Sequence, residues 1–170
     1  MARENRKFGG RREKPEFDQK LLDLARVTRV VKGGRRFRFR ATLVIGNRKG
    51  RVGVGVGKGA DVSDSINKAF ENAKKNMINV TMRKNTIPHD IHYKMGSAKI
   101  ILKPASAGRG VIAGGAVRAV VNLAGIKDIV SKSLGTANKL NVARAAVAAL
   151  ATFEHARNRK ARTGEMSSEK

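Results

Sequence analysis

Three regularly spaced arginines are the residues in this chain best suited to bind a charged ligand. Arg36, Arg38 and Arg40 alternate with apolar residues in the segment RRFRFRATLVIG. Such alternation places the three side chains on one face of a β-strand. Guanidinium groups donate paired hydrogen bonds to phosphate oxygens, so this face suits a row of phosphate groups. The chemistry predicted for the segment is therefore phosphate binding.

A glycine-rich stretch follows these arginines and raises the alternative of a loop that holds a single nucleotide. It ends in Gly57-Lys58, and a P-loop contains the same Gly-Lys pair. In a P-loop, Ser or Thr follows this pair and another glycine lies five residues before its glycine. This chain has Gly59 and Val52 at those positions. Both requirements fail, which favours a phosphate polymer over a nucleotide.

A second glycine cluster covers residues 108–115. The dinucleotide-binding fingerprint is G-x-G-x-x-G, whereas Gly108, Gly110 and Gly114 are spaced with one residue too many. Asp128 lies about where that fingerprint has its ribose-binding acid. The spacing favours a tight crossing between a strand and a helix, and an enzyme that binds a nucleotide here is the alternative.

Other groups capable of catalysis or metal binding are sparse. His89 and His92 stand close together near the start of a predicted strand, but no further ligand cluster accompanies them. Ser106 has no nucleophile elbow around it, no pair of carboxylates stands out, and the chain has no cysteine. We therefore expect no enzymatic activity, no cofactor, no metal and no small-molecule substrate.

The net charge indicates the kind of partner. Of 170 residues, 37 are Lys or Arg and 13 are Asp or Glu, which gives a net charge of +24. The excess positive charges repel one another in a compact fold. A bound polyanion offsets this repulsion and releases its counterions. Nucleic acid is the first candidate partner and an anionic membrane surface a distant second. With no secretory signal and no stretch near the roughly 20 apolar residues of a membrane span, a soluble intracellular protein is expected.

The arginines belong to a predicted unit of three strands and one helix. Strands are expected over about residues 22–31, 36–45 and 52–56, separated by glycine-containing turns. A helix capped by Ser63 follows. It is expected to cover the core face of the sheet with an apolar stripe made of Ile66, Ala69, Phe70, Ala73 and Met77.

The two faces of this sheet have different predicted roles. Phe37 and Phe39 are expected in the core, because they alternate on the same face as Leu43, and the stacking of unpaired bases on them is the alternative. The valines of the third strand are placed on that core face. Gly53 and Gly55 are placed on the arginine face, where bare backbone lets another molecule approach closely.

A second unit is predicted beyond about residue 83, and the fold class is therefore α+β with two small domains. Strands over 91–95 and 98–103, a helix over about 115–123, a strand over 126–133 and a helix capped by Asn141 give the order β-β-α-β-α. The polar, basic ends predict arms that are disordered or ordered by a partner. The expected division is a basic arm (1–16), an N-terminal domain (17–82), a C-terminal domain (83–156) and a basic tail (157–170).

One continuous basic surface is predicted to contact RNA. It combines the arginine face and the glycine row with the turn after the first strand and the tip of the next hairpin. The residues assigned to it are Arg29, Lys32, Gly33, Gly34, Arg35, Arg36, Arg38, Arg40, Arg48, Lys49, Gly53, Gly55 and Lys58.

Several ordered blocks resemble one known family. RVTRVVKGGRRFRFRATLVIGNRKGRVGVGVGKG, KKNMINV, GRGVIAGGAVRAV and KSLGTANKLNV are similar to the bacterial small-subunit ribosomal protein S5 family, over about residues 22–156. The resemblance implies a double-stranded-RNA-binding-like β-β-β-α domain without its first helix, followed by a domain like the second domain of S5. Lys139 stands where the family usually has proline.

The same resemblance implies a function in translation. Its expected partners are small-subunit ribosomal RNA and the ribosomal proteins S4 and S8, with messenger RNA near its channel into the subunit as a further candidate. It implies a cytoplasmic location in the small ribosomal subunit and an influence on decoding accuracy. The surroundings of Gly108, Arg109 and Arg118 are implied to face S4.

Overall fold

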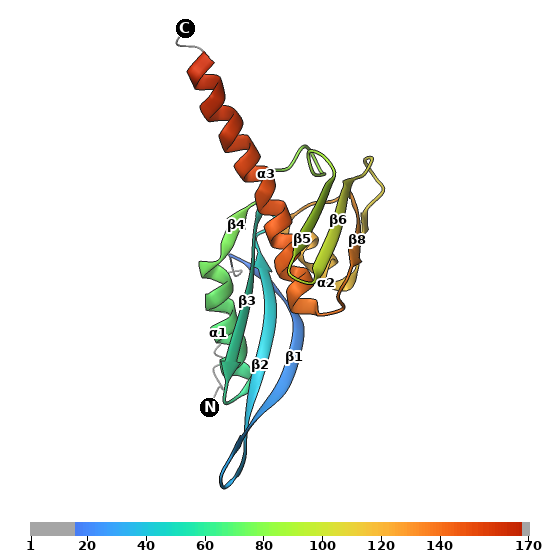
Figure 1. The fold of residues 1–170 in the computed structure, drawn as a ribbon. Helices are drawn as coiled ribbons and strands as arrows, with labels where there is room; N and C mark the ends of the chain where they lie inside the picture. The colour runs from blue at the N-terminus through green and yellow to red at the C-terminus, as the bar shows by residue number, and fades with distance from the viewer. Residues whose placement is uncertain (1–15, 168–170) are drawn as a thin grey trace, which may run out of the picture.

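The structure is a computed structural model that describes residues 16–167, so nearly all of the predicted arm over residues 1–16 lies outside it. Two four-stranded sheets and their helices form two small α+β domains, which confirms the predicted fold class (Figure 1). The elements are β1 (Asp18–Val31), β2 (Gly34–Gly46), β3 (Arg51–Gly59), α1 (Val62–Lys75), β4 (Met77–Asn79), β5 (Ile91–Met95), β6 (Ala98–Pro104), β7 (Val111–Ile112), α2 (Gly115–Ala124), β8 (Ile129–Leu134) and α3 (Lys139–Ser167).

The N-terminal sheet is an antiparallel meander in the order β1-β2-β3-β4. The short strand β4 is an addition to the three strands predicted, and it pairs with the start of β3, with Val52 opposite Ile78. Helix α1 begins at Val62 with Asp61 as its N-cap residue, rather than at the predicted cap, Ser63. The helix ends at Lys75, so the last member of the predicted stripe, Met77, lies in β4 and still packs against the same apolar cluster.

Helix α1 covers a different set of β3 residues from the one predicted. Residues directly opposite each other in a sheet share a face, and Gly53 and Gly55 lie opposite Ile45 and Leu43. All four are buried under α1. A Cβ atom built at Gly55 would overlap with the backbone of α1 at Ala69 and Ala73. The glycines therefore let the helix lie close to the sheet, and their predicted place on an open arginine face is wrong.

The valine face of the N-terminal sheet packs against the C-terminal domain. Val44, Val52 and Val54 are buried in one cluster with Val117 and Val121 of α2. The inner halves of β2 and β3 are thus buried on both faces, by α1 on one side and by the C-terminal domain on the other. The two domains therefore share one continuous apolar core.

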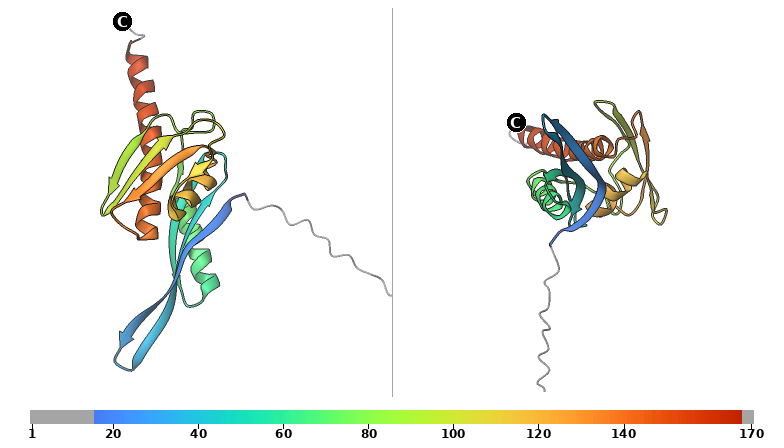
Figure 2. Two further views of the ribbon diagram at one scale, coloured as in Figure 1. Left: turned by 90° about the vertical axis from the view of Figure 1, so that its right-hand side faces the viewer. Right: turned by 90° about the horizontal axis from the view of Figure 1, so that it is seen from below.

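The C-terminal sheet has the order β5-β6-β8-β7, with only β7 parallel to its neighbour β8. Helices α2 and α3 pack on one face of this sheet, as Figures 1 and 2 show. Helix α3 begins at Lys139, two residues before the predicted cap, Asn141. It runs on as one helix to Ser167, so the basic tail predicted from residue 157 is largely a continuation of α3.

Backbone hydrogen bonds fix the tip of the β2–β3 hairpin to the end of α2. The amides of Arg48 and Gly50 donate to the carbonyl oxygens of Leu123 and Ala124, both at 2.9 Å. Gly125 caps α2 in the left-handed conformation, at φ +94°, where a glycine is favoured. The tip is thus part of the domain junction rather than a free loop.

Candidate nucleic-acid interface

Strands β1 and β2 extend well beyond the rest of the N-terminal sheet. Strand β3 ends at Gly59, which pairs with Phe39, so the strand segments beyond this pair form a two-stranded ribbon. We call residues 25–40 the distal hairpin. Figures 1 and 2 show it projecting from the body of the protein, on the side away from the C-terminal domain. Every charged residue within it is Arg or Lys.

One face of the distal hairpin forms a groove of about 470 Å³, which we call the basic groove. Arg29 lies directly opposite Arg36, and Arg40 lies directly opposite Lys58 of β3. Like charges in directly opposed positions destabilise a sheet. The residues that line the groove are Val27, Thr28, Arg29, Val31, Arg36, Arg38 and Lys58. The sequence prediction of an arginine face thus corresponds to a concave basic surface.

The three predicted arginines differ in their surroundings. Arg36 and Arg38 are exposed, whereas Arg40 is half-buried. The Nε atom of Arg40 is buried without a hydrogen-bond partner among the described residues. In the part of the chain that the structure describes, no ion pair involves an arginine of the groove. An anion with several acceptor atoms is the ligand that this arrangement fits.

Other predicted residues fall into two groups along β2. The turn at the end of the distal hairpin is exposed, and it comprises Lys32, Gly33, Gly34 and Arg35. Arg35 lies opposite Val30, so its side chain points to the face opposite the groove. Arg48 and Lys49 lie past the other end of β2, where the guanidinium of Arg48 pairs with Asp18 at 2.7 Å. Gly46 follows Arg36 by ten positions along β2, which is about 33 Å of strand. The prediction of one continuous basic surface is therefore wrong.

Burial excludes two of the predicted contact residues. Gly53 and Gly55 are buried between the strands and α1, so RNA cannot approach their backbone. The opposite correction applies to Phe37, which was expected in the core and is 45% exposed. Helix α1 covers Leu43 and Ile45 but does not extend over Phe37. Strand β3 ends at Gly59, opposite Phe39, and α1 packs on the part of β2 that pairs with β3.

The second glycine cluster is a turn held by a buried carboxylate. Asp128 is 4% exposed, and its Oδ1 atom accepts a hydrogen bond from the amide of Gly110 at 2.9 Å. Gly108 and Gly110 have φ values of +87° and +77°, which only glycine adopts readily. Asp128 therefore stabilises the crossing into β7, and this use of its carboxylate argues against the alternative of a ribose-binding acid.

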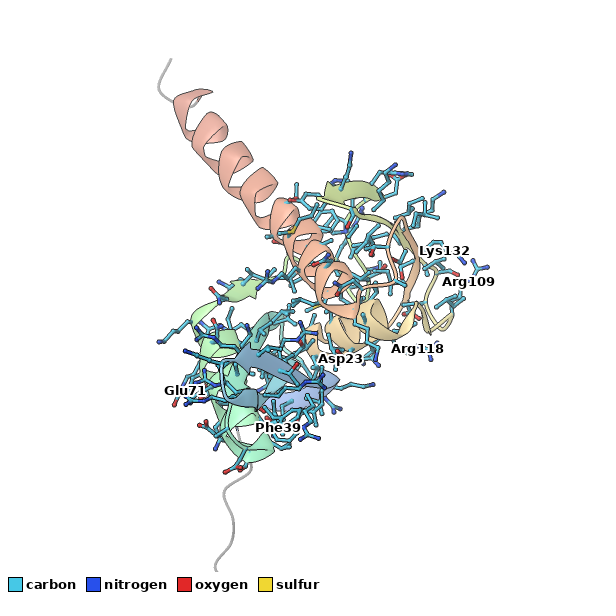
Figure 3. All side chains as sticks on the ribbon, turned by 60° about the horizontal axis from the view of Figure 1, so that its bottom comes forward. Asp23, Phe39, Glu71, Arg109, Arg118 and Lys132 are labelled. Atoms are coloured by element: carbon cyan, nitrogen blue, oxygen red, sulfur yellow. The ribbon has the colours of Figure 1, made fainter. Side chains whose placement is uncertain are left out.

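The two arginines of the predicted protein interface are both exposed near this crossing. Figure 3 labels Arg109 and Arg118 on the side of the C-terminal domain away from Glu71 of α1. A single long contact, 3.5 Å, joins the guanidinium of Arg118 to the carbonyl oxygen of Val111. Both side chains can therefore reach a partner without breaking an internal ion pair among the described residues.

Residues considered for catalysis or metal binding are not brought together. The ring of His89 packs edge-on against Phe153, with 4.9 Å between ring centroids, while His92 is exposed on β5. Among the side chains that the structure describes, those of residues 16–153, no three from His, Cys, Asp or Glu gather where they could hold a metal ion. No helix in the described part of the chain combines the length and apolar character needed to cross a bilayer.

Sequence reasoning missed a second basic surface on the outer face of the C-terminal sheet. Lys94 lies opposite Lys99, and Lys132 lies opposite Ile101, which in turn lies opposite His92. The lysines are exposed. The signal in the sequence was the spacing of Lys99 and Lys103, four positions apart, which places both on one face of this strand.

The fold and the basic groove define a class: a protein of two small α+β domains with a concave basic surface that suits a polyanion. Residues 17–81 match the family described as "Ribosomal protein S5, N-terminal domain", and residues 93–163 match "Ribosomal protein S5, C-terminal domain". Proteins named "Small ribosomal subunit protein uS5", from Campylobacter jejuni strains 81-176 and RM1221, are 56% identical to this chain over 135 residues. That alignment covers 79% of this chain and 92% of each relative.

The chain belongs to the ribosomal protein S5 family. Its relatives are structural proteins of the small ribosomal subunit, so the prediction of a ribosomal protein without enzymatic activity is confirmed. Membership of this family also confirms the predicted location in the small subunit in the cytoplasm.

Proposed function

We propose that this protein is a structural component of the small ribosomal subunit that binds ribosomal RNA through the basic groove of its distal hairpin. The observation that carries the proposal is the pairing of like charges across the groove. Arg29 lies opposite Arg36, and Arg40 opposite Lys58, without an acidic partner for either pair among the described residues. A phosphate chain bound between such pairs turns their repulsion into attraction.

The groove acts by positioning RNA rather than by chemistry. Guanidinium contacts to phosphate fix the place and orientation of an RNA segment without reading its sequence. Each neutralised phosphate releases condensed counterions, which supplies most of the affinity. Arg36 and Arg38 line the groove with exposed guanidinium groups, and half-buried Arg40 follows them on the same face of β2 with an unpaired Nε atom. The protein thereby reduces repulsion between the RNA segments that it joins.

Replacing Arg36 and Arg38 together with glutamine is expected to weaken RNA binding while the chain stays folded. Both side chains are exposed, so the core keeps its contacts. Arg40 is left in place because it is half-buried. Each lost phosphate contact lowers the slope of log affinity against log salt by about 0.7–0.9 units, or about 1.4–1.8 units for the pair. The measurement is affinity for small-subunit ribosomal RNA at several salt concentrations, with thermal melts as a check on folding.

Lys74→Gln combined with Lys75→Gln is the matched control for this experiment. It also removes two exposed positive charges, but from the last turn of α1, away from the basic groove. We expect the control to keep nearly the whole salt slope. An equal loss of slope in the two variants means that binding follows net charge alone, and the assignment of the groove then fails.

The C-terminal domain is proposed to bridge neighbouring ribosomal proteins, S4 and S8. The crossing at residues 108–118 is the surface proposed for S4, near the channel by which messenger RNA reaches the subunit. Two observations support this proposal. Buried Asp128 accepts a hydrogen bond from the turn, and the side chains of Arg109 and Arg118 are exposed next to it. Through this contact the protein is proposed to influence decoding accuracy.

Arg118→Ala is expected to weaken binding to purified S4 and to change the rate of misreading. A guanidinium that forms a desolvated pair with a carboxylate is worth about 2–5 kcal/mol at an interface, and one at the rim is worth less. The side chain is exposed, so the melting temperature should change little. Arg144→Ala removes a comparable exposed arginine from α3 and serves as the control. Unchanged affinity for S4 in the Arg118 variant contradicts this placement.

A further inference from the structure

The face of the distal hairpin opposite the basic groove has a different chemistry. Val27 and Arg38 form one opposed pair on the groove face, so the ring of Phe37, in the neighbouring pair, points to the other side. We call that side the aromatic face. It continues with Phe39 and with the opposed pair of Val30 and Arg35, and Phe37 and Val30 are 45% and 75% exposed.

The aromatic face has no covering element in the described part of the chain. Gly59, opposite Phe39, is where β3 ends, and α1 lies over the inner half of β2 from that point. Figures 1 and 2 show the outer part of the hairpin standing clear of α1 and of the C-terminal domain. A phenylalanine ring and a valine therefore remain in water on a segment whose charges are all basic.

Arg26 lies over the ring of Phe37. The guanidinium carbon is 3.6 Å from the ring centroid, which is the geometry of a cation–π contact. Arg26 is exposed, and it makes no side-chain hydrogen bond or ion pair among the described residues. A planar guanidinium layered on an aromatic ring presents a flat, positively charged surface to solvent. Unpaired bases stack both on aromatic rings and on guanidinium planes.

We propose that Arg26 and Phe37 form a stacking platform for one unpaired base of the RNA. The inference rests on the proposed function, since it assumes that the basic groove on the other face holds the phosphate backbone. The distal hairpin would then be contacted by RNA on both faces, by phosphates in the groove and by a base on the platform. Acidic groups next to this face begin only at the start of α1, near Gly59, where Asp64 pairs with Lys68 at 2.8 Å. A partner that carries its own negative charge therefore suits the outer part of the face better than an apolar peptide does.

The test uses the full-length protein with two RNA probes. One is a stem–loop with a single bulged 2-aminopurine, and the other is the same stem fully paired. Binding of the wild-type protein is expected to change the fluorescence of the bulged probe, and to be about tenfold tighter for the bulged probe than for the paired one. Phe37→Leu keeps an apolar side chain but removes the ring, so both the fluorescence change and the preference should disappear. Its salt slope should stay as in the wild type, because no phosphate contact is lost.

The variant with Arg36→Gln and Arg38→Gln separates this proposal from the function on which it rests. It should flatten the salt slope and keep the fluorescence change, the reverse of Phe37→Leu. An unchanged fluorescence signal in a folded Phe37→Leu protein overturns the platform and leaves the basic groove intact. Wild-type protein that binds neither probe overturns both. Unaltered RNA binding together with poorer incorporation of Phe37→Leu into subunits assigns the aromatic face to a protein partner, against the proposal.

Discussion

Gly55→Ala is expected to lower the melting temperature by about 10 °C, although it adds only one methyl group. The new Cβ would overlap with the carbonyl oxygen of Ala69 and with the backbone amide nitrogen of Ala73. Both are main-chain atoms of α1, so no side-chain rotation relieves the contact, and the helix has to move away from β3. Overpacking of this kind costs about 1–3 kcal/mol, and contact with rigid backbone places this case near the upper value.

Gly33→Ala is the matched control for this measurement. Gly33 lies in the turn of the distal hairpin, and a Cβ atom there has no neighbour within 4 Å. Its backbone needs no left-handed conformation, unlike that of the next residue, Gly34, at φ +137°. We expect Gly33→Ala to change the free energy of unfolding by about 0.5 kcal/mol or less. The measurement is the melting temperature of each variant, which should fall for Gly55→Ala and not for Gly33→Ala. Similar melting temperatures for the two variants contradict the close contact between α1 and β3.

The strand and helix order was predictable because each element carries a local signal. Alternation in β2 and the helical spacing of Ile66, Ala69 and Phe70 specify their elements without help from the rest of the chain. The two faces of β3 were not predictable in this way. The pairing of Gly55 with Leu43 depends on the number of residues in the intervening turn, and a shift of one residue reverses every face.

In the candidate site, too, local sequence patterns predicted some features, whereas others depend on contacts between distant parts of the chain. Local alternation sufficed to place Arg36 and Arg38 on one face of a strand. The separation of Arg48 from that face follows from the length of β2 and from the docking of its far end onto α2, which no local pattern encodes. Phe37 was misplaced because alternation identifies a face but not how far along the strand a covering helix extends.

Gly125→Ala is expected to uncouple the two domains. Gly125 has φ +94°, a conformation that costs an alanine about 1–2 kcal/mol. The added Cβ would also overlap with the carbonyl group of Arg48 at the tip of the β2–β3 hairpin. The tip then has to withdraw from α2, which breaks the hydrogen bonds from Arg48 to Leu123 and from Gly50 to Ala124. Loss of these contacts loosens the apolar core that the domains share.

Calorimetry distinguishes coupled from uncoupled domains. The wild-type protein should unfold in one transition, because Val44 and Val52 of one domain are buried with Val121 of the other. Gly125→Ala should melt earlier and in two steps. Gly114→Ala is the control at the opposite end of α2, where φ is −64° and a Cβ meets nothing within 4 Å. A single transition at the wild-type temperature in the Gly125 variant contradicts the coupling. RNA affinity should survive in either variant, because the basic groove lies at the far end of β2 from this junction.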